Sequence, residues 1–126
     1  GLPDYLQEVL VRRYIQSAAY QSLSEYMLEH TAAPWLGSDG KPALYRQMAQ
    51  ADQRYTDEVE SRYGEITMPV LVLWGAEDAW IPIEQGRKLT EAIRGARFVT
   101  LPDTGHLVIE EAPGALIKEV LAFCHE

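Results

Sequence analysis

The sequence is poor in the features that mark several classes of protein. It has a single cysteine, Cys124, so no disulfide can form within the chain. No run approaches the roughly 18 consecutive apolar residues of a membrane-spanning helix. Basic residues are outnumbered by acidic ones, 11 to 19, and the net charge of −8 argues against a nucleic-acid surface, which needs a basic face. We therefore expect neither a membrane nor a nucleic acid as partner.

The 126 residues do contain enough apolar material for one globular domain. Apolar residues make up 47% of the chain, including three tryptophans and seven tyrosines, which is enough to form a core. The acidic residues are spread through helical segments, where they favour solubility. Cys124 falls on the apolar side of the last helical segment and is expected to be a buried, structural thiol. Neither His30 nor His125 has a partner at the spacing of metal ligands, so we expect no metal site.

Hydrophobic periodicity divides the chain near residues 64–67, and the part before this point is helical in pattern. A first helix is predicted over 3–18, and a second from a cap at Ser22 or Ser24 to about His30. Residues 34–40 have turn chemistry around a tryptophan. A third helix of about 20 residues is predicted from Pro42 to Val59, with a break near Thr56 as an alternative.

The part after residue 67 alternates strands with helices. Residues 68–74 are apolar on both faces, as in a parallel strand that is covered on both sides. A helix over 83–94, ended by Gly95, leads to a second strand over 97–101, and a last helix begins at Pro113. Its apolar stripe is expected to cover one face of the sheet. The fold class predicted is α/β, with a helical region followed by a β-α-β-α unit containing two parallel strands.

Two polar residues follow the predicted strands at similar distances. Asp78 stands four residues after Trp74, and Gly105, which precedes His106, stands four residues after Leu101. The carboxyl ends of parallel strands are where ligands bind in open α/β sheets. An acid and a base presented there are two parts of a nucleophile-base-acid triad. Taken alone, His106 could equally be an exposed or packed loop residue, and Asp78 a turn acid before the next helix.

Residues 68–126 resemble the C-terminal part of an α/β-hydrolase. The matching text is Met68–Pro82, Leu101–His106 and Glu111-Ala112-Pro113. Members of that family run in the order nucleophile, acid, histidine, with the nucleophile on an elbow such as G-x-S-x-G. Neither an elbow nor an HGGG-like oxyanion loop occurs here. The resemblance therefore implies a partial α/β-hydrolase fold whose nucleophile lies outside this chain.

The resemblance also implies roles for the two polar residues. His106 is expected to act as general base, and Asp78 as the acid that orients it. Some family members take this acid from the preceding strand, which is outside this chain. Other nearby carboxylates have ordinary explanations. Glu77 is expected to be solvated, Asp103 to brace its loop, and Glu111, like its neighbour Glu110, to favour the N-terminus of the helix at Pro113.

Residues 1–67 have the position and helical character of the cap, or lid, of many α/β-hydrolases, and residues 68–126 correspond to the C-terminal part of the catalytic core. The segment 34–37 and the residues 45–47 resemble the cap of haloalkane-dehalogenase-like and esterase-like members. Caps exclude water and select the substrate. Trp35 and Trp80 are the candidates for the wall of a pocket that binds a small-molecule substrate, against ordinary core packing as the alternative.

The reaction implied is hydrolysis without a cofactor. A serine nucleophile would give ester or C–C bond hydrolysis, and an aspartate nucleophile would give a haloalkane dehalogenase or epoxide hydrolase. The rival hypothesis is a non-catalytic binding or assembly module. We expect the full-length protein to be a cytoplasmic enzyme and this chain alone to be inactive. Because the Val70–Trp74 strand would have one bare edge, we expect pairing with the missing N-terminal half, or a homo-oligomer formed through that edge or swapped helices.

Overall fold

The computed structural model describes residues 3–125 and divides them into two compact units. We call residues 3–17 and 22–54 the helical unit, and residues 18–21 and 55–125 the strand unit. The four residues 18–21 therefore belong to the strand unit, although in the sequence they lie between two stretches of the helical unit.

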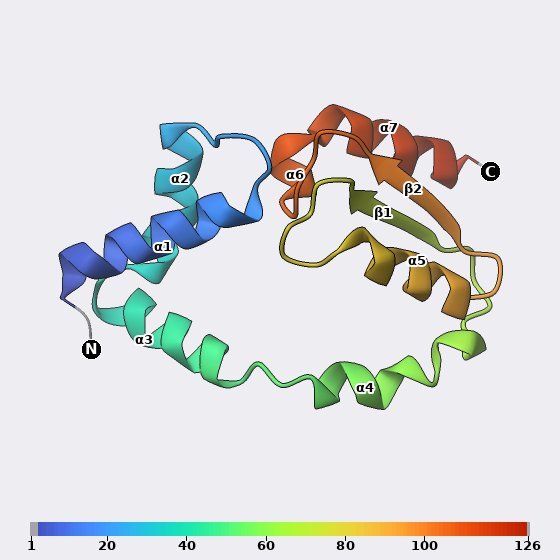
Figure 1. Ribbon diagram of the computed structural model, residues 1–126, viewed down its shortest axis with the longest axis horizontal. Coiled ribbons are helices and arrows are strands. Elements are labelled where there is room, and N and C mark those ends of the chain that lie inside the picture. Colours follow the sequence, from blue (N-terminus) through green and yellow to red (C-terminus); the bar gives the residue numbers. More distant parts are fainter. Residues whose placement is uncertain (1–2, 126) are drawn as a thin grey trace. The chain divides into compact units, whose positions relative to one another are not determined.

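The helical unit contains α1 (Asp4–Ala18), whose last residue lies in the strand unit, α2 (Glu25–Ala32), the 3-10 turn η1 (Ala33–Trp35) and α3 (Gly37–Ala49) (Figure 1). Its buried apolar residues come from three of these helices, so that a small core joins them: Val11, Ile15, Ala32 and Leu44. Ser24 begins α2 as predicted, since its hydroxyl accepts a hydrogen bond from the Met27 amide at 3.2 Å. The first two helices are thus confirmed, with ends that lie within about two residues of the predicted ones.

The prediction of turns over residues 34–40 is wrong in its second half, because α3 already begins at Gly37. Gly40 explains the error. A Cβ atom at this position would lie 2.4 Å from the Pro34 carbonyl oxygen, so the helix can pack on the preceding turn only without a side chain. The glycine that suggested a turn serves close packing instead.

The long third helix that the sequence predicts is also interrupted earlier than expected. Helix α3 ends at Ala49, and α4 (Arg54–Glu60) begins after a gap that precedes Thr56. Asp52 gives the physical reason, because its carboxylate accepts a hydrogen bond from the Arg54 amide at 3.0 Å. A side chain that satisfies an amide at a helix start favours a new helix there over continuation of the old one.

Two parallel strands form the sheet of the strand unit, as predicted. Strand β1 (Leu71–Gly75) pairs with β2 (Arg97–Leu101) in a register that sets Leu71 opposite Arg97 and Gly75 opposite Leu101. Figure 1 shows α5 (Ile83–Ala92) and α7 (Pro113–Cys124) on either side of this pair. The remaining elements are the 3-10 turn η2 (Tyr63–Glu65) and α6 (Val108–Glu111), a short helix that the sequence analysis did not predict.

Helix α5 approaches the sheet closely at Gly86. A Cβ atom there would lie 2.6 Å from the Trp74 ring and 3.0 Å from that of Phe98. Both aromatic residues belong to the strands, so a glycine in the helix makes room for two large rings. The Trp74 ring nitrogen also donates a hydrogen bond to the Ile81 carbonyl at 3.1 Å, which ties β1 to the segment before α5.

The prediction that Cys124 is buried is wrong, since this residue is exposed. It belongs to a stripe on α7 whose other members are also exposed: Ile117, Val120 and Leu121. The half-buried side of α7 carries Leu116, Glu119 and Phe123 instead. A sheet of two strands is too narrow to cover the full apolar surface of this helix, and the thiol stays on the uncovered part. No helix among residues 3–125 is both long enough and apolar enough to cross a membrane.

Candidate active site

The loops that follow β1 and β2 are joined by backbone hydrogen bonds beyond the end of the sheet. The Ala76 amide donates to the Leu101 carbonyl, and the Glu77 amide to the Thr104 carbonyl, both at 2.9 Å. Gly75 permits this approach, because a Cβ atom at its position would lie 2.1 Å from the Gly105 carbonyl oxygen. The sequence thus places the residues that follow Gly75 directly beside those that follow Leu101.

Asp78 is held by three hydrogen bonds at this edge of the sheet. One carboxylate oxygen, Oδ1, accepts from the Trp80 and Ile81 amides, each at 2.9 Å. The other, Oδ2, lies 2.9 Å from Nδ1 of His106. The Asp78 side chain is only 5% exposed. A buried carboxylate with its oxygens occupied in this way has a fixed orientation, which is what an orienting acid needs.

His106 contacts Asp78 through one ring nitrogen, as the positions of the two residues in the sequence predict. With the carboxylate as acceptor, Nδ1 carries the proton and Nε2 is left with its lone pair. Among residues 3–125, Nε2 has no hydrogen-bonding partner. The side chain is 31% exposed, so the ring is accessible to a substrate or a water molecule. The amide of His106 donates to the Ala18 carbonyl at 2.8 Å and anchors the backbone below the ring.

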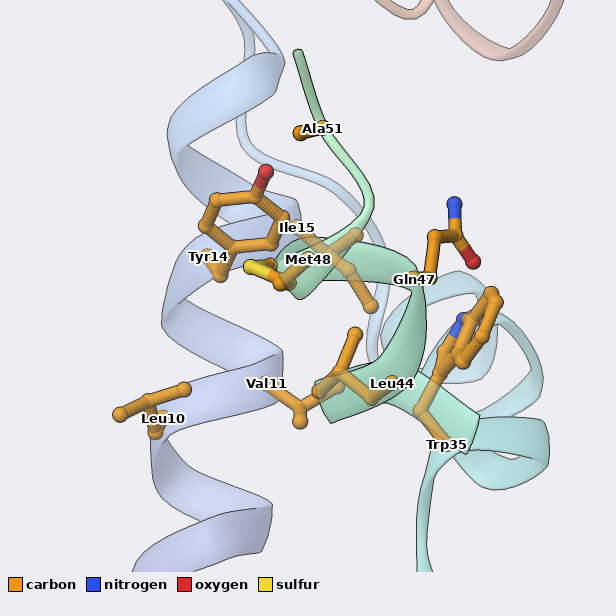
Figure 2. Close-up of a pocket in the computed structure, with 9 residues that line it drawn as sticks. All are labelled: Leu10, Val11, Tyr14, Ile15, Trp35, Leu44, Gln47, Met48 and Ala51. Atoms are coloured by element: carbon orange, nitrogen blue, oxygen red, sulfur yellow. The ribbon is translucent and has the colours of Figure 1, made fainter. Parts of the chain in front are cut away.

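The two tryptophans that the sequence suggested for a pocket wall lie in different units. The Trp80 ring is tilted by 35° against the His106 ring, with the centroids 5.2 Å apart, so it borders the Asp78–His106 pair. Trp35 belongs to the helical unit and lines a cavity of about 280 Å³ there (Figure 2). The cavity is largely apolar, and its other walls come mainly from α1 and α3: Leu10, Val11, Tyr14, Ile15, Leu44, Gln47, Met48 and Ala51.

Comparison with known proteins identifies the family. A family model described as the alpha/beta hydrolase fold matches residues 25–113. The chain belongs to the α/β-hydrolase family. A solved structure from this family, an α/β-hydrolase fold protein of Burkholderia ambifaria, is 44% identical to this chain with a TM-score of 0.92. The match includes 97% of this chain and 45% of the Burkholderia protein. The chain therefore has a partial α/β-hydrolase fold.

Two curated relatives of this chain are named as hydrolases. One is the uncharacterized hydrolase YugF of Bacillus subtilis, 29% identical over 67% of this chain and 33% of its own length. The other is the 2-hydroxy-6-oxononadienedioate/2-hydroxy-6-oxononatrienedioate hydrolase of Cupriavidus pinatubonensis, 33% identical over 62% of this chain and 27% of its own length. This chain thus spans about a third of the length of the curated relatives it matches.

One residue near Asp78 and His106 makes contacts that the sequence analysis did not find. Glu111 was expected to favour the start of the last helix, but its carboxylate contacts other parts of the backbone. Oε1 accepts from the Tyr20 and Gln21 amides at 2.7 and 3.0 Å, and Oε2 accepts from the Gly105 amide at 2.9 Å. Two of these donors lie 90 residues or more away in the chain, so no local spacing could have indicated the contact.

The carboxylates that remain near the pair do not join it. Glu77 is exposed, as expected. Asp103 has a φ of +51°, which an aspartate tolerates in a tight turn, and its carbonyl accepts a hydrogen bond from the Gln21 side chain at 3.1 Å. In the part of the chain that the structure describes, no three His, Cys, Asp or Glu side chains gather as metal ligands would.

Proposed function

We propose that this chain supplies the base and the orienting acid of an α/β-hydrolase triad, with His106 as base, Asp78 as acid and the nucleophile outside the chain. The observation that carries the proposal is the contact of 2.9 Å between Nδ1 of His106 and Oδ2 of Asp78, at the carboxyl ends of two parallel strands. Ester or C–C bond hydrolysis is the favoured reaction, and the names of the hydrolase relatives support hydrolysis as the general class.

The hydrogen bonds define how the pair would work. Asp78 keeps the His106 proton on Nδ1, so the lone pair of Nε2 is available to take a proton from the nucleophile or from a hydrolytic water. The ring is then an imidazolium, and the fixed carboxylate of Asp78 stabilises its charge. Nε2 later returns the proton to the leaving group. The two amides on Oδ1 keep the carboxylate from rotating away while the ring changes charge.

Residues 1–67 are proposed to be the cap of this hydrolase, and residues 68–126 the C-terminal part of its core. The proposal is supported by the helical character of the first region and by the apolar cavity that Trp35 lines. An apolar cavity of about 280 Å³ suits the hydrocarbon part of a small-molecule substrate. Trp80, which borders the His106 ring, would contact the part of the substrate next to the reacting bond.

The sheet of this chain is proposed to be completed by other polypeptide. Among the described residues, β1 pairs only with β2, so its second edge has no strand beside it. An apolar strand with an unpaired edge is a template for further pairing. Either an N-terminal half that carries the nucleophile or a second copy of this chain would cover that edge.

The experiment is to join the N-terminal part of the Burkholderia ambifaria protein, which this chain does not cover, to the complete chain. Hydrolysis of p-nitrophenyl esters of increasing acyl length is measured for this chimera, the chain alone and the intact Burkholderia protein. We expect turnover by the chimera and none above background by the chain alone, because base and acid without nucleophile and oxyanion hole lack the groups that lower the barrier most.

Two results would contradict the proposal. Turnover by the chain alone that disappears in His106→Ala would show a nucleophile within residues 1–126. A folded chimera that is inactive on an ester that the Burkholderia protein hydrolyses would show that His106 and Asp78 cannot serve as base and acid. Exchanging the nucleophile of the chimera for alanine is the matched control, and it should remove turnover as completely as His106→Ala does.

A further inference from the structure

The Glu111 carboxylate lies at the centre of a cluster of backbone contacts beside the proposed base. It accepts hydrogen bonds from three amides, those of Tyr20, Gln21 and Gly105. Gly105 immediately precedes His106, whose own amide donates to the Ala18 carbonyl at 2.8 Å. The segment 18–21 and the loop before His106 are therefore held together through one side chain and one backbone bond.

The packing around Gly105 leaves little freedom to this arrangement. A Cβ atom on Gly105 would lie 2.5 Å from the Tyr20 amide nitrogen and 2.9 Å from Oε2 of Glu111. The backbone of the loop thus packs closely against both the Glu111 carboxylate and the segment 18–21. A further hydrogen bond, from the Gln21 side chain to the Asp103 carbonyl at 3.1 Å, also joins the segment 18–21 to the loop.

From these contacts we infer that Glu111 is a positioning residue, which sets the orientation of the His106 ring toward Asp78 by fixing the loop before it against residues 18–21. The inference rests on the proposed function, because the orientation of His106 matters for chemistry only if this histidine is the base. The hydrogen bonds of the Glu111 carboxylate go to backbone amides and not to the His106 ring or to Asp78, so Glu111 acts only through the backbone. Its formal charge is satisfied by three amide donors, and an isosteric neutral side chain could accept from only part of them.

The ring nitrogens of His106 provide a readout that a general loss of stability does not move. Nitrogen-15 NMR of the complete chain at about pH 8.5, where an ordinary imidazole is neutral, distinguishes the two tautomers by the shifts of Nδ1 and Nε2. His30→Gln and His125→Gln variants identify the signals of the other two histidines. In the unaltered chain we expect one dominant tautomer with the proton on Nδ1, as the contact with Asp78 requires.

Glu111→Ala is the decisive variant, and Glu110→Ala is its control, since Glu110 is an exposed neighbour of equal charge. In Glu111→Ala we expect the Nδ1 and Nε2 shifts to move toward each other as the tautomers mix. We also expect the Tyr20, Gln21 and Gly105 amides to exchange with solvent about tenfold faster or more. In Glu110→Ala neither should change.

Unchanged ring signals in a folded Glu111→Ala variant would overturn the inference, even if the three amides exchange faster, because Glu111 would then hold the loop without orienting the ring. If Glu111→Ala does not fold, Glu111→Gln decides, since it keeps one acceptor oxygen. It should shift the ring signals less but in the same direction, and unchanged signals there overturn the inference as well. A chimera that lacks hydrolytic activity although the ring signals respond to Glu111 would contradict only the proposed function.

Discussion

The two units of this chain hold their candidate functional residues in different ways. In the strand unit, Asp78 and His106 are fixed by directional hydrogen bonds from backbone and side chain, and both loops are tied to each other. In the helical unit, Trp35 borders an apolar cavity, and several of the side chains around it remain nearly half exposed: Leu10, Tyr14 and Met48.

This difference corresponds to two kinds of task. Proton transfer needs atoms held within a few tenths of an ångström, and hydrogen bonds to buried groups provide that accuracy. Selection of a substrate needs a surface of suitable size and polarity, which many combinations of apolar side chains can form. Substitutions in the strand unit should therefore change the rate of the chemical step, and substitutions in the helical unit should change stability and substrate affinity.

The largest effect is expected for His106→Ala in the chimera. Removal of the base takes away the group that activates the nucleophile, so kcat should fall by about 10⁴-fold or more. The circular dichroism spectrum should stay the same, because the ring is partly exposed and its loss opens no core cavity. A decrease of less than about tenfold in a folded variant would show that the strand unit does not carry the base.

A smaller decrease is expected for Asp78→Asn, which keeps the shape of the side chain but loses its charge. The amide group can no longer accept from His106 and stabilise the imidazolium in the same way, so kcat should fall by about 10² to 10⁴-fold. Glu77→Gln is the matched control, since this neighbouring carboxylate is exposed. If Glu77→Gln lowered kcat more than Asp78→Asn, the assignment of the orienting acid would be wrong.

The next effect concerns stability in the helical unit. Leu44 is buried at 8% exposure, and Leu44→Ala should lower the free energy of unfolding by about 2 to 4 kcal/mol. Met48 lines the same cavity but is 45% exposed, so Met48→Ala should cost less than about 1 kcal/mol. Urea denaturation measures both. Equal costs would mean that the small core of this unit does not depend on Leu44.

How far the sequence could predict this molecule also differs between the units. The strands and the pairing of Asp78 with His106 followed from two apolar runs and from the two polar residues at similar distances after them, because the carboxyl ends of parallel strands lie at one edge of the sheet. The course of the helical unit was predicted less well. Gly40 looked like a turn residue but is a packing residue, and Asp52 starts a new helix where the apolar periodicity alone continued the old one.

What the sequence could not indicate are contacts between distant segments. The bonds of Glu111 to Tyr20 and Gln21 join residues about 90 positions apart, and the carboxylate had a sufficient local explanation at a helix start. The exposure of Cys124 depended on the width of the sheet below α7, which is a tertiary property. In both cases the local pattern was not sufficient, because contacts with distant parts of the chain decided the outcome.

The uncovered apolar surface of the strand unit should make the chain associate. Light scattering at micromolar concentration should give a mass above that of one chain, because burying an exposed leucine stabilises association by about 1.5 to 3 kcal/mol. Leu121→Lys on the exposed stripe of α7 should weaken association about tenfold, while Ala122→Lys adds the same charge with less loss of apolar area. A wild-type monomer at these concentrations would contradict the prediction and would leave the edge of β1 exposed in solution.

The last effect, a change of KM with little change of kcat, is expected for Trp35→Ala, and it tests the division of tasks most directly. If the cavity of the helical unit binds the hydrocarbon part of the substrate, removal of the Trp35 ring from the cavity wall should raise the KM of the chimera about tenfold for long acyl esters. The kcat should stay within about twofold. Trp80→Ala is the comparison variant, because its ring borders His106 and its removal should lower kcat as well. The ratio of the change in KM to the change in kcat should grow with acyl length for Trp35→Ala and stay constant for Trp80→Ala. A fall in kcat without a change in KM for Trp35→Ala would mean that the helical unit takes part in the chemical step, and the distinction between the two units would not hold.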